Sequence, residues 1–394
     1  MITAEQPQIS AGFRWLETVD EAFEVMLAAV ERAQRTIRLE VYIYRASPIG
    51  EAFRDAFIRA LRRGVKVWVL VDALGSVSLS DKFWEPFIEA GGEMRWFNPL
   101  KLRRLGFRDH RKMLVIDEEI GFVGGYNIAP EYQGDGVSKG WHDLGLKVPA
   151  ELAQPLAASF DRQFRLADVR FRRFMRLRRS DVRQQVTTSE GELFINGPGR
   201  GPNLMINSIK NDLNSSRRIW IISAYFLPPR HLRRSLVRLA RQGRDVRILL
   251  PGKSDVALSQ YAARFLYHGL LRAGVKIYEY EPQILHTKMF LFDNAVYVGS
   301  ANMDKRSLYM NYELLVRVQK PGLLTDAAVF FTDALERSKP VALHDWHRAR
   351  SFWSKLREQW SYFVLSKLDP YVSELQLKLS KDIPHARPPE KAQP

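Results

Sequence analysis

The sequence predicts an α/β protein built from two tandem halves, each with a sheet between layers of helices. Its length of 394 residues suits two domains of ordinary size better than one. Its composition, 46% hydrophobic and 26% charged, is that of a globular chain with real cores. The same order of helices and strands then occurs twice along the chain, which indicates an internal duplication.

The repeated order can be followed element by element. Each half begins with an amphipathic helix and a buried strand, continues with a helix that closes on a glycine before an apolar strand, and adds a further glycine-preceded strand. The expected elements are residues 19–33, 36–44, 51–63, 64–72 and 87–97 in the first half, and 206–213, 217–226, 230–242, 243–251 and 271–280 in the second.

The boundary between the halves is expected close to residue 185. Residues 160–179 are dense in arginine and phenylalanine, and residues 196–202 are punctuated by glycine and proline like a loop. We therefore assign residues 1–185 to an N-terminal half and residues 186–394 to a C-terminal half. Beyond residue 319 the pattern predicts a helical extension.

Charge and cysteine content limit the partners and the compartment. Lys and Arg number 60 against 44 Asp and Glu, a formal net charge of +16 that attracts nucleic acid, anionic lipid or phosphorylated substrates. The chain has no cysteine, which fits a reducing compartment, and its first residues do not resemble an export signal. Apolar stretches are too short to span a bilayer. We expect a cytoplasmic protein whose membrane contact is peripheral.

Each half contains one copy of the pattern His-x-Lys-x-x-x-x-Asp. Both copies are followed by a glycine-containing turn and an asparagine, Asn127 in the first half and Asn302 in the second. A single copy would be an ordinary surface histidine, but a duplicate with a matching tail indicates a catalytic site. The candidate residues are His110, Lys112 and Asp117 in the first copy, and His286, Lys288 and Asp293 in the second.

These residue types suit displacement at phosphorus. In an extended strand, residues two apart share a face, so His110 and Lys112 project together. A neutral imidazole can attack phosphorus, and a second imidazolium can protonate the departing alkoxide. The lysines and asparagines can stabilise the phosphate oxygens. One site therefore needs a histidine from each half.

With these motifs the chain resembles the phospholipase D superfamily, from about residue 15 to residue 318. The resemblance implies a pseudo-twofold arrangement with one shared active site, a covalent phosphohistidine, His110 as nucleophile and His286 as general acid. It implies that Asp143 and Glu313 orient the histidines, and that Asp117 and Asp293 mainly hold loops. The residues alone leave the order of the histidines open, and Asp143 and Glu313 could instead be solvated carboxylates.

No cofactor and no metal are expected. His344 and His347 have the spacing of metal ligands on a helix face, but no third ligand accompanies them, so a structural role is favoured. His142 could assist in the site, although a packing role is at least as plausible.

The substrate class is less constrained than the reaction. Cations alternate with large apolar residues in residues 97–107, 160–179 and 352–367, a pattern typical of interfacial helices on anionic membranes and also of core helices with charged outer faces. The chain resembles bacterial cardiolipin synthases of the shorter type. That resemblance implies phosphatidylglycerol as substrate, a peripheral position on the cytoplasmic face of the bacterial inner membrane, and no nucleic-acid partner. A phospholipase D-type hydrolase, a phosphodiester nuclease and a degenerate binding domain remain alternatives. Phosphatidylethanolamine as donor, another alcohol as acceptor and the oligomeric state are also left open.

Overall fold

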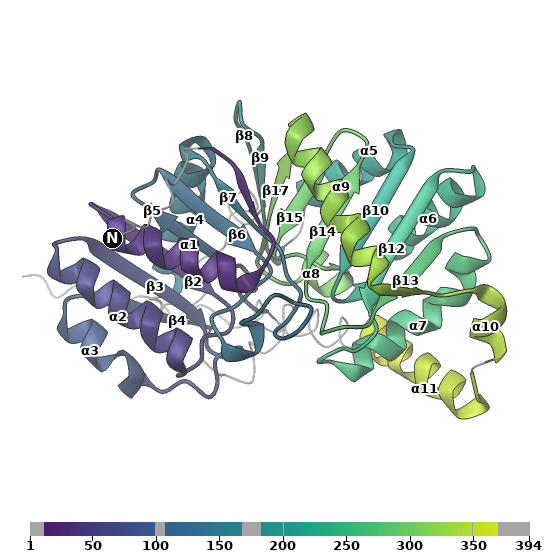
Figure 1. Cartoon of the computed structure of the whole chain (residues 1–394), viewed down its shortest axis with the longest axis horizontal. Helices are drawn as coiled ribbons and strands as arrows, with labels where there is room; N and C mark the ends of the chain where they lie inside the picture. Colours follow the sequence, from purple (N-terminus) through teal and green to yellow (C-terminus); the bar gives the residue numbers. More distant parts are fainter. Residues whose placement is uncertain (1–11, 99–106, 168–182, 200, 349, 369–394) are drawn as a thin grey trace, which may run out of the picture.

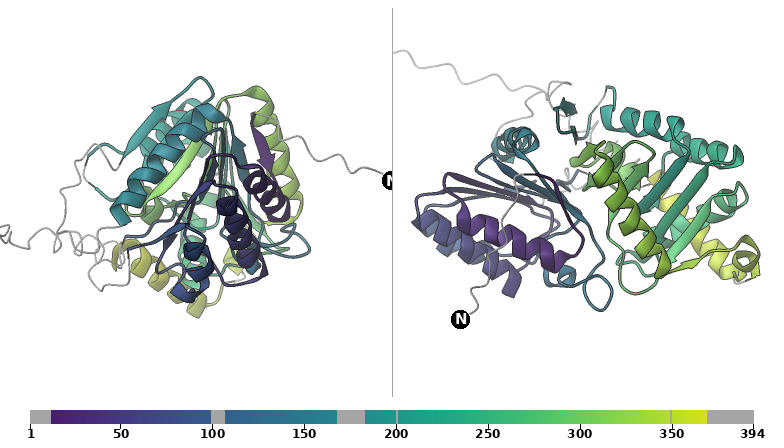
Figure 2. Two further views of the ribbon diagram at one scale, coloured as in Figure 1. Left: turned by 90° about the vertical axis from the view of Figure 1, so that its left-hand side faces the viewer. Right: turned by 45° about the horizontal axis from the view of Figure 1, so that its top comes forward.

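Two mixed sheets lie side by side, one in each half of the chain (Figure 1). The structure is a computed structural model that describes residues 12–98, 107–167, 183–199, 201–348 and 350–368. Helices cover the sheets, and Figure 2 shows the layered halves from two further directions. The predicted α/β class with two similar halves is confirmed.

Within the described residues, the first sheet has seven strands in the order β1-β7-β6-β5-β2-β3-β4. Strands β2, β3 and β4 are parallel, and β5 runs antiparallel beside β2. The strands are β1 (Arg14–Leu16), β2 (Thr36–Val41), β3 (Lys66–Asp72), β4 (Glu93–Phe97), β5 (Met113–Ile116), β6 (Ile120–Gly124) and β7 (Gly145–Val148).

Helices cover the two faces of this sheet, and alternate side chains of β5 show how. Leu114 and Ile116 pack in the cluster formed with α1 and α2, whereas Met113 and Val115 pack in the cluster that contains α4. The Thr18 side chain caps α1 by accepting from the Glu21 amide. The helical elements of this half are α1 (Val19–Arg32), α2 (Pro48–Arg62), η1 (Asp81–Trp84), α3 (Glu85–Glu89), η3 (Pro130–Tyr132) and α4 (Ala150–Ala167).

The part of the chain that the structure describes places nine strands in the second sheet, in the order β18-β13-β12-β10-β14-β15-β17-β9-β8. Its run β13-β12-β10-β14-β15-β17 repeats the run β4-β3-β2-β5-β6-β7 of the first sheet, with the same parallel and antiparallel pairings. The strands are β8 (Gln184–Thr187), β9 (Glu192–Asn196), β10 (Arg218–Ser223), β12 (Asp245–Pro251), β13 (Lys276–Tyr280), β14 (Lys288–Phe292), β15 (Val296–Gly299), β17 (Glu313–Val318) and β18 (Ser338–Pro340); β11 (Phe226–Leu227) and β16 (Met303–Asp304) form a separate pair.

The helices of the second half follow the same order and then continue into an extension. They are α5 (Leu204–Ser215), α6 (Arg230–Arg241), α7 (Ala257–Leu271), α8 (Lys305–Tyr309), α9 (Pro321–Glu336), α10 (Leu343–Arg348), α11 (Phe352–Phe363) and the π-helical η4 (Val364–Leu368). Beyond residue 319 the described residues form α9, the strand β18, α10, α11 and η4, and the assignment of this segment as a helical extension stays a prediction.

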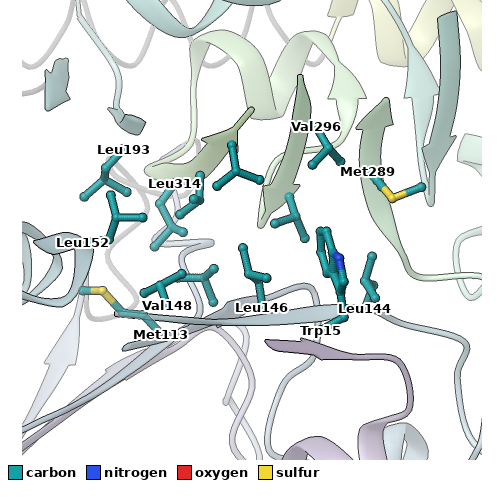
Figure 3. Packing of buried hydrophobic residues seen from close by; sticks show 14 of the residues in the cluster. Trp15, Met113, Leu144, Leu146, Val148, Leu152, Leu193, Met289, Val296 and Leu314 are labelled. Carbon is teal, nitrogen blue, oxygen red and sulfur yellow. The ribbon is translucent and has the colours of Figure 1, made fainter. Parts of the chain in front are cut away.

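One hydrophobic cluster joins the halves. β7 and α4 contribute side chains from the first half, and β9, β14, β15, β17 and α9 contribute side chains from the second. Figure 3 shows Leu146 and Leu152 facing Leu193 and Leu314 across this layer. Burial of apolar surface on both sides holds the two sheets in a fixed relation, on which a shared site depends.

Two expectations about residues 160–187 need comment. Phe160 and Phe164 lie on α4 and are buried in the cluster between the halves. For them the interfacial interpretation was wrong, because they fill the core; residues 168–179 lie outside the described residues. Strand β8 spans the expected boundary between residues 185 and 186 and pairs with β9 of the second sheet. The exact boundary stays a prediction.

Candidate active site

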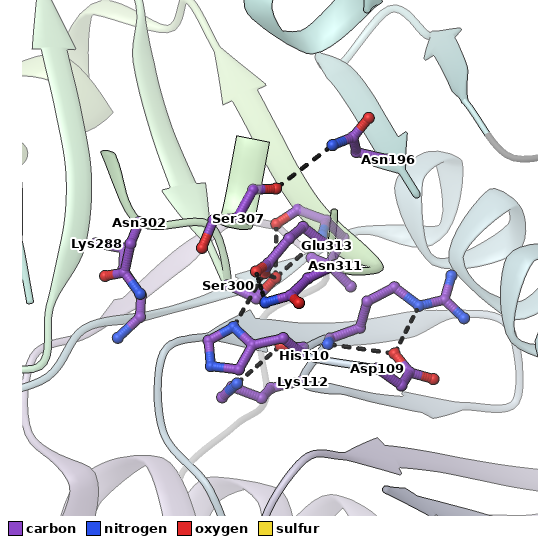
Figure 4. A network of polar contacts seen from close by, with 12 residues as sticks. Asp109, His110, Lys112, Asn196, Lys288, Ser300, Asn302, Ser307, Asn311 and Glu313 are labelled. Atoms are coloured by element: carbon purple, nitrogen blue, oxygen red, sulfur yellow. Dashed lines mark hydrogen bonds and ion pairs between the residues drawn. The ribbon is translucent and has the colours of Figure 1, made fainter. Parts of the chain in front are cut away.

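The two motif histidines precede equivalent strands of the two sheets. His110 lies just before β5 and His286 just before β14, and both are buried. Lys112 Nζ donates to the His110 carbonyl at 2.8 Å, and Lys288 Nζ donates to the His286 carbonyl. Figure 4 shows His110 and Lys112 beside Lys288 and Asn302 of the other half. The structure therefore brings both motifs to one place.

Each histidine is held by a carboxylate of the opposite half. His110 Nδ1 lies 3.1 Å from Glu313 Oε2, and His286 Nδ1 lies 2.7 Å from Asp143 Oδ2. Both carboxylates are almost completely buried. An ionised carboxylate can only accept, so with both carboxyl groups ionised Nδ1 of each ring donates, which leaves Nε2 available for chemistry. The spacing of these residues along the chain did not indicate this exchange between the halves.

Main-chain hydrogen bonds also join each histidine to the opposite half. The His110 amide donates to the Tyr312 carbonyl at 2.9 Å, and the Tyr312 amide donates to the Arg108 carbonyl at 2.8 Å. On the other side, the His286 amide donates to the His142 carbonyl at 2.8 Å. The backbone of each histidine is thus hydrogen-bonded to the segment that carries its carboxylate, which fixes the ring relative to its acceptor.

The two carboxylates have different surroundings. Ser300 Oγ donates to Glu313 Oε2, and Asn311 also contacts that carboxylate. Burial raises the pKa of Glu313 to about 8, against the opposing effect of Lys112. Asp143 Oδ1 instead accepts from the Leu144 amide at 2.8 Å. The two halves are therefore similar in outline and unlike in electrostatics.

Gly125 leaves space for the Asp143 carboxylate because it has no side chain. A Cβ at Gly125 would lie 2.3 Å from Asp143 Oδ1, which is closer than any real contact. The equivalent position in the second half is Ser300, whose hydroxyl bonds to Glu313. The Gly-Gly and Gly-Ser tails of the motifs are thus part of the carboxylate sites.

Burial and neighbouring cations lower the pKa of both histidines. Burial, followed by Lys112, Lys288 and His286, lowers the pKa of His110 well below its usual value. Burial and Lys288 also lower the pKa of His286, but Asp143 opposes this change. A more strongly depressed pKa favours the free imidazole at His110, and the opposing carboxylate favours the proton at His286.

The lysines also respond to burial. The pKa of Lys112 is lowered to about 7 and that of Lys288 to about 8, in each case first because the ammonium group is buried. An anionic phosphate placed between them would favour the charged form of both. The site is therefore electrostatically suited to a phosphodiester.

Aromatic rings surround the histidines, and sequence reasoning missed them. The Tyr42 ring lies 5.0 Å from the His110 ring, and the rings of Tyr132 and Trp141 each lie 5.2 Å from that of His286. Tyr42 directly follows β2, the strand beside β5, so its position in the repeat was the available signal. These rings restrict the imidazoles and exclude water from their faces.

The motif asparagines hold neighbouring loops with their side-chain oxygens. Asn127 Oδ1 accepts from the Ile43 amide at 2.9 Å, and Asn302 Oδ1 accepts from the Tyr225 amide at 3.4 Å. Asn127 Nδ2 also donates to the Tyr132 hydroxyl at 2.6 Å. Each amide group has a second hydrogen for a ligand, so a role in phosphate binding stays a prediction.

The motif aspartates are not brought into the site. Asp117 lies at the far end of β5 and accepts from the backbone amides of Gln34, Arg35 and Thr36 at 2.7–2.8 Å. Asp293, at the far end of β14, accepts from the amides of Arg217 and Arg218. Because four strand residues separate each lysine from its aspartate, the distance is about 16 Å. Both hold the start of a neighbouring strand, which agrees with the holding role that the resemblance implied, and a direct part in catalysis stays a prediction.

The side chains of the other histidine candidates have different contacts. His142 Nδ1 lies 3.0 Å from Thr287 Oγ1, and burial lowers its pKa to about 4, which fits the packing role. His344 is exposed beside Asp345. Among the residues described, no three metal-binding side chains cluster, and no helix has the length and apolar character to cross a membrane. Residues 99–106 of the basic, apolar segment before His110 lie outside the described residues.

Comparison with known proteins assigns the family. A family model described as "Cardiolipin synthase, PLD-like domain" matches residues 26–164 and 209–334. The chain belongs to this family. The resemblance to the phospholipase D superfamily inferred from the twin motifs is thereby confirmed, and each matched segment contains one motif.

Curated relatives cover most of this chain. It is 34% identical over 337 residues to cardiolipin synthase 1 of Bacillus anthracis, an alignment of 82% of this chain and 66% of the relative. It is 34% identical over 342 residues to the cardiolipin synthase of Geobacillus kaustophilus, which covers 84% and 65%. The chain spans about two thirds of the length of these relatives.

Solved structures share the fold. The crystal structure of phosphatidylserine synthase from Haemophilus influenzae superposes with a TM-score of 0.69 at 15% identity, over 93% of this chain and 96% of that one. Polyphosphate kinase from Porphyromonas gingivalis gives a TM-score of 0.56 at 15% identity, over 93% and 53%. At this identity the similarity concerns the arrangement of the elements alone.

Proposed function

We propose that this protein is a cardiolipin synthase that transfers a phosphatidyl group between two phosphatidylglycerol molecules. The observation that carries the proposal is the pair of buried histidines, each held at Nδ1 by a carboxylate of the opposite half. The family assignment supports a phosphatidyl transfer, and cardiolipin synthases from two genera align with most of this chain.

In the first step His110 Nε2 attacks the phosphorus of phosphatidylglycerol. The phosphorus–oxygen bond to the terminal glycerol breaks, and His286 Nε2–H protonates the departing alkoxide, so glycerol leaves and phosphatidyl-His110 remains. Lys112 and Lys288 stabilise the phosphate oxygens as negative charge develops. The more strongly lowered pKa of His110 supports this order of roles.

In the second step a hydroxyl group of another phosphatidylglycerol attacks the phosphohistidine. His286 accepts the hydroxyl proton, the phosphorus–nitrogen bond breaks, and cardiolipin forms with His110 free again. Water at the same position would give phosphatidic acid instead. The aromatic rings against both histidines favour the lipid alcohol because they restrict access of water.

The proposed partners follow from this reaction. Phosphatidylglycerol would supply both the donor and the acceptor, and the protein would act peripherally on the cytoplasmic face of the bacterial inner membrane. A net charge of +16 supports attraction to an anionic lipid surface.

The decisive experiment is incubation of pure protein with phosphatidylglycerol and a chelator, followed by mass spectrometry of the lipids. Cardiolipin with glycerol is the expected result. Phosphatidic acid alone would identify a hydrolase, and cleavage of DNA or RNA without lipid turnover would identify a nuclease.

A further inference from the structure

Helix α11 carries a stripe of large apolar side chains that face solvent. Their exposed fractions range from 47% for Leu356 to 74% for Trp353. At about 100° per residue, all of them fall within an arc of about 100° on the helix. We call this set the α11 stripe; its members are Phe352, Trp353, Leu356, Trp360 and Phe363.

The opposite side of α11 is polar and buried. Glu358 is 4% exposed and Ser361 is 1% exposed. A helix on the surface of a soluble protein ordinarily turns its apolar side inward. In α11 this order is reversed, so core packing does not explain the apolar residues.

Specific contacts hold α11 in this orientation. The Tyr362 ring stacks on Phe265 of α7 with centroids 4.6 Å apart, and the Arg357 guanidinium lies 3.8 Å from the Tyr261 ring centroid. Glu358 forms a buried ion pair with Arg350. These contacts place the helix firmly along α7, on the outer side of the second half (Figure 1), and direct the stripe away from the body.

Cations border the stripe. Lys355 and Arg357 are exposed and fall just outside the two edges of the apolar arc at the helical repeat. An apolar face with flanking cations enters the region between lipid headgroups and acyl chains, where the cations meet anionic headgroups. Charge complementarity therefore favours an anionic bilayer over a second copy of this cationic chain.

The stripe is joined to the edge of the active site through α7. Asp255 lies two residues before α7 and accepts from the Tyr225 hydroxyl at 2.7 Å. The Tyr225 amide in turn donates to Asn302 of the second motif. A surface that contacts α11 would thus lie next to the loop that borders the site.

We propose that the α11 stripe is the surface by which this protein docks on an anionic phospholipid bilayer. This inference rests on the proposed function, since it supplies the route by which a membrane-resident substrate reaches the site. Aromatic side chains enter the interfacial region, and α7 sets the distance between the bilayer and the site.

The test compares the full chain with two variants in sedimentation with vesicles. The stripe variant carries Phe352→Ser, Trp353→Ser, Trp360→Ser and Phe363→Ser. The control variant carries Val77→Ser, Ile88→Ser and Val329→Ser, which are also exposed apolar positions but lie on other elements. Thermal unfolding and circular dichroism establish that all three proteins are folded.

We expect the stripe variant to bind vesicles of phosphatidylglycerol and phosphatidylcholine at least about tenfold more weakly than the full chain, and the control variant to bind normally. Brominated phosphatidylglycerol should quench the tryptophan fluorescence of the full chain, and the stripe variant should lose most of this quenching. Binding should weaken on pure phosphatidylcholine.

Two results would overturn the proposal. Equal vesicle binding by the stripe variant would show that another surface docks. A self-association that the stripe variant abolishes, with unchanged vesicle binding, would make the stripe a contact between copies. The proposed function is tested separately by cardiolipin formation in detergent micelles with the unaltered chain: no product there, together with stripe-dependent vesicle binding, would refute the reaction and keep the docking surface.

Discussion

The carboxylate that holds His286 offers a sharp test through the substitution Asp143→Asn. Asp143 Oδ2 lies 2.7 Å from His286 Nδ1, and Oδ1 accepts from the Leu144 amide. In the variant the side-chain oxygen keeps the bond to Leu144, so the amide NH₂ must face His286. That group donates, which forces the imidazole into the tautomer with its proton on Nε2. His286 could then neither protonate glycerol efficiently nor accept the acceptor's proton.

The magnitude follows from the bond that is lost. A buried hydrogen bond to a charged group contributes about 1.5–3 kcal/mol, or roughly 10- to 150-fold in rate. The wrong tautomer increases the loss, as in a serine protease triad, where it reaches about 10⁴. We expect kcat to fall by about 10²–10⁴. Because Asp143 raises the pKa of His286, the alkaline limb of the kcat/KM profile should also move to lower pH.

The assay measures glycerol release from phosphatidylglycerol in detergent micelles between pH 5 and 9. Asp245→Asn is the control, since Asp245 likewise accepts from Trp220 and Lys276 but lies on β12 away from the histidines. A kcat for Asp143→Asn within threefold of the unaltered chain, at an unchanged pH profile, would refute the orienting role.

Four further outcomes are expected. His110→Ala and His286→Ala should each reduce turnover by several orders of magnitude, with exposed His344→Ala as control. Acid quenching during turnover should recover the phosphoryl group on His110, and its recovery on His286 would reverse the roles. Asp117→Ala should lower the free energy of unfolding in urea by about 2–3 kcal/mol, because three backbone amides lose their acceptor. The folded fraction should keep its kcat, and a lost kcat at full stability would contradict this prediction. Gly125→Ala should reduce kcat at least about tenfold by displacing the Asp143 carboxylate, whereas Gly322→Ala, with open space around it, should not; equal activities would argue against the close fit. Calorimetry should show that a soluble phosphodiester binds more weakly as pH rises from 6 to 9, since Lys112 and Lys288 have pKa values of about 7 and about 8. An affinity that does not change with pH would exclude charged lysines as the binding groups.

The order of elements was predictable because it depends on local patterns. Apolar residues at helical or alternating spacing, with glycines at helix ends, placed the main helices and strands of both halves within a few residues of their observed bounds. The twin motifs likewise identified both histidines and both lysines.

The exchange of carboxylates was not predictable from spacing. Asp143 follows His110 in the same half, yet it holds His286, which lies 143 residues further along the chain. Glu313 holds His110 across 203 residues. Which partner each carboxylate meets depends on how the two sheets pack through their common core, and no local pattern encodes that packing.

The same limit applies to apolar segments that contain cations. Phe160 and Phe352 both lie in such segments, yet Phe160 is buried between the halves and Phe352 is 71% exposed. Spacing predicts a helix with one apolar side in both cases. Only the position of the neighbouring elements decides whether that side meets the core or solvent.

Because each histidine is held by a carboxylate of the other half, the two halves depend on each other for activity. A substitution beside Asp143 alters the proton affinity of a histidine in the other half, and one beside Glu313 does the reverse. A change around the carboxylate of one half therefore alters the reactivity of the histidine in the other half. The halves differ at Gly125, which leaves room for the Asp143 carboxylate, and at Ser300, whose hydroxyl donates to Glu313, so a change at either position acts first on a histidine of the other half.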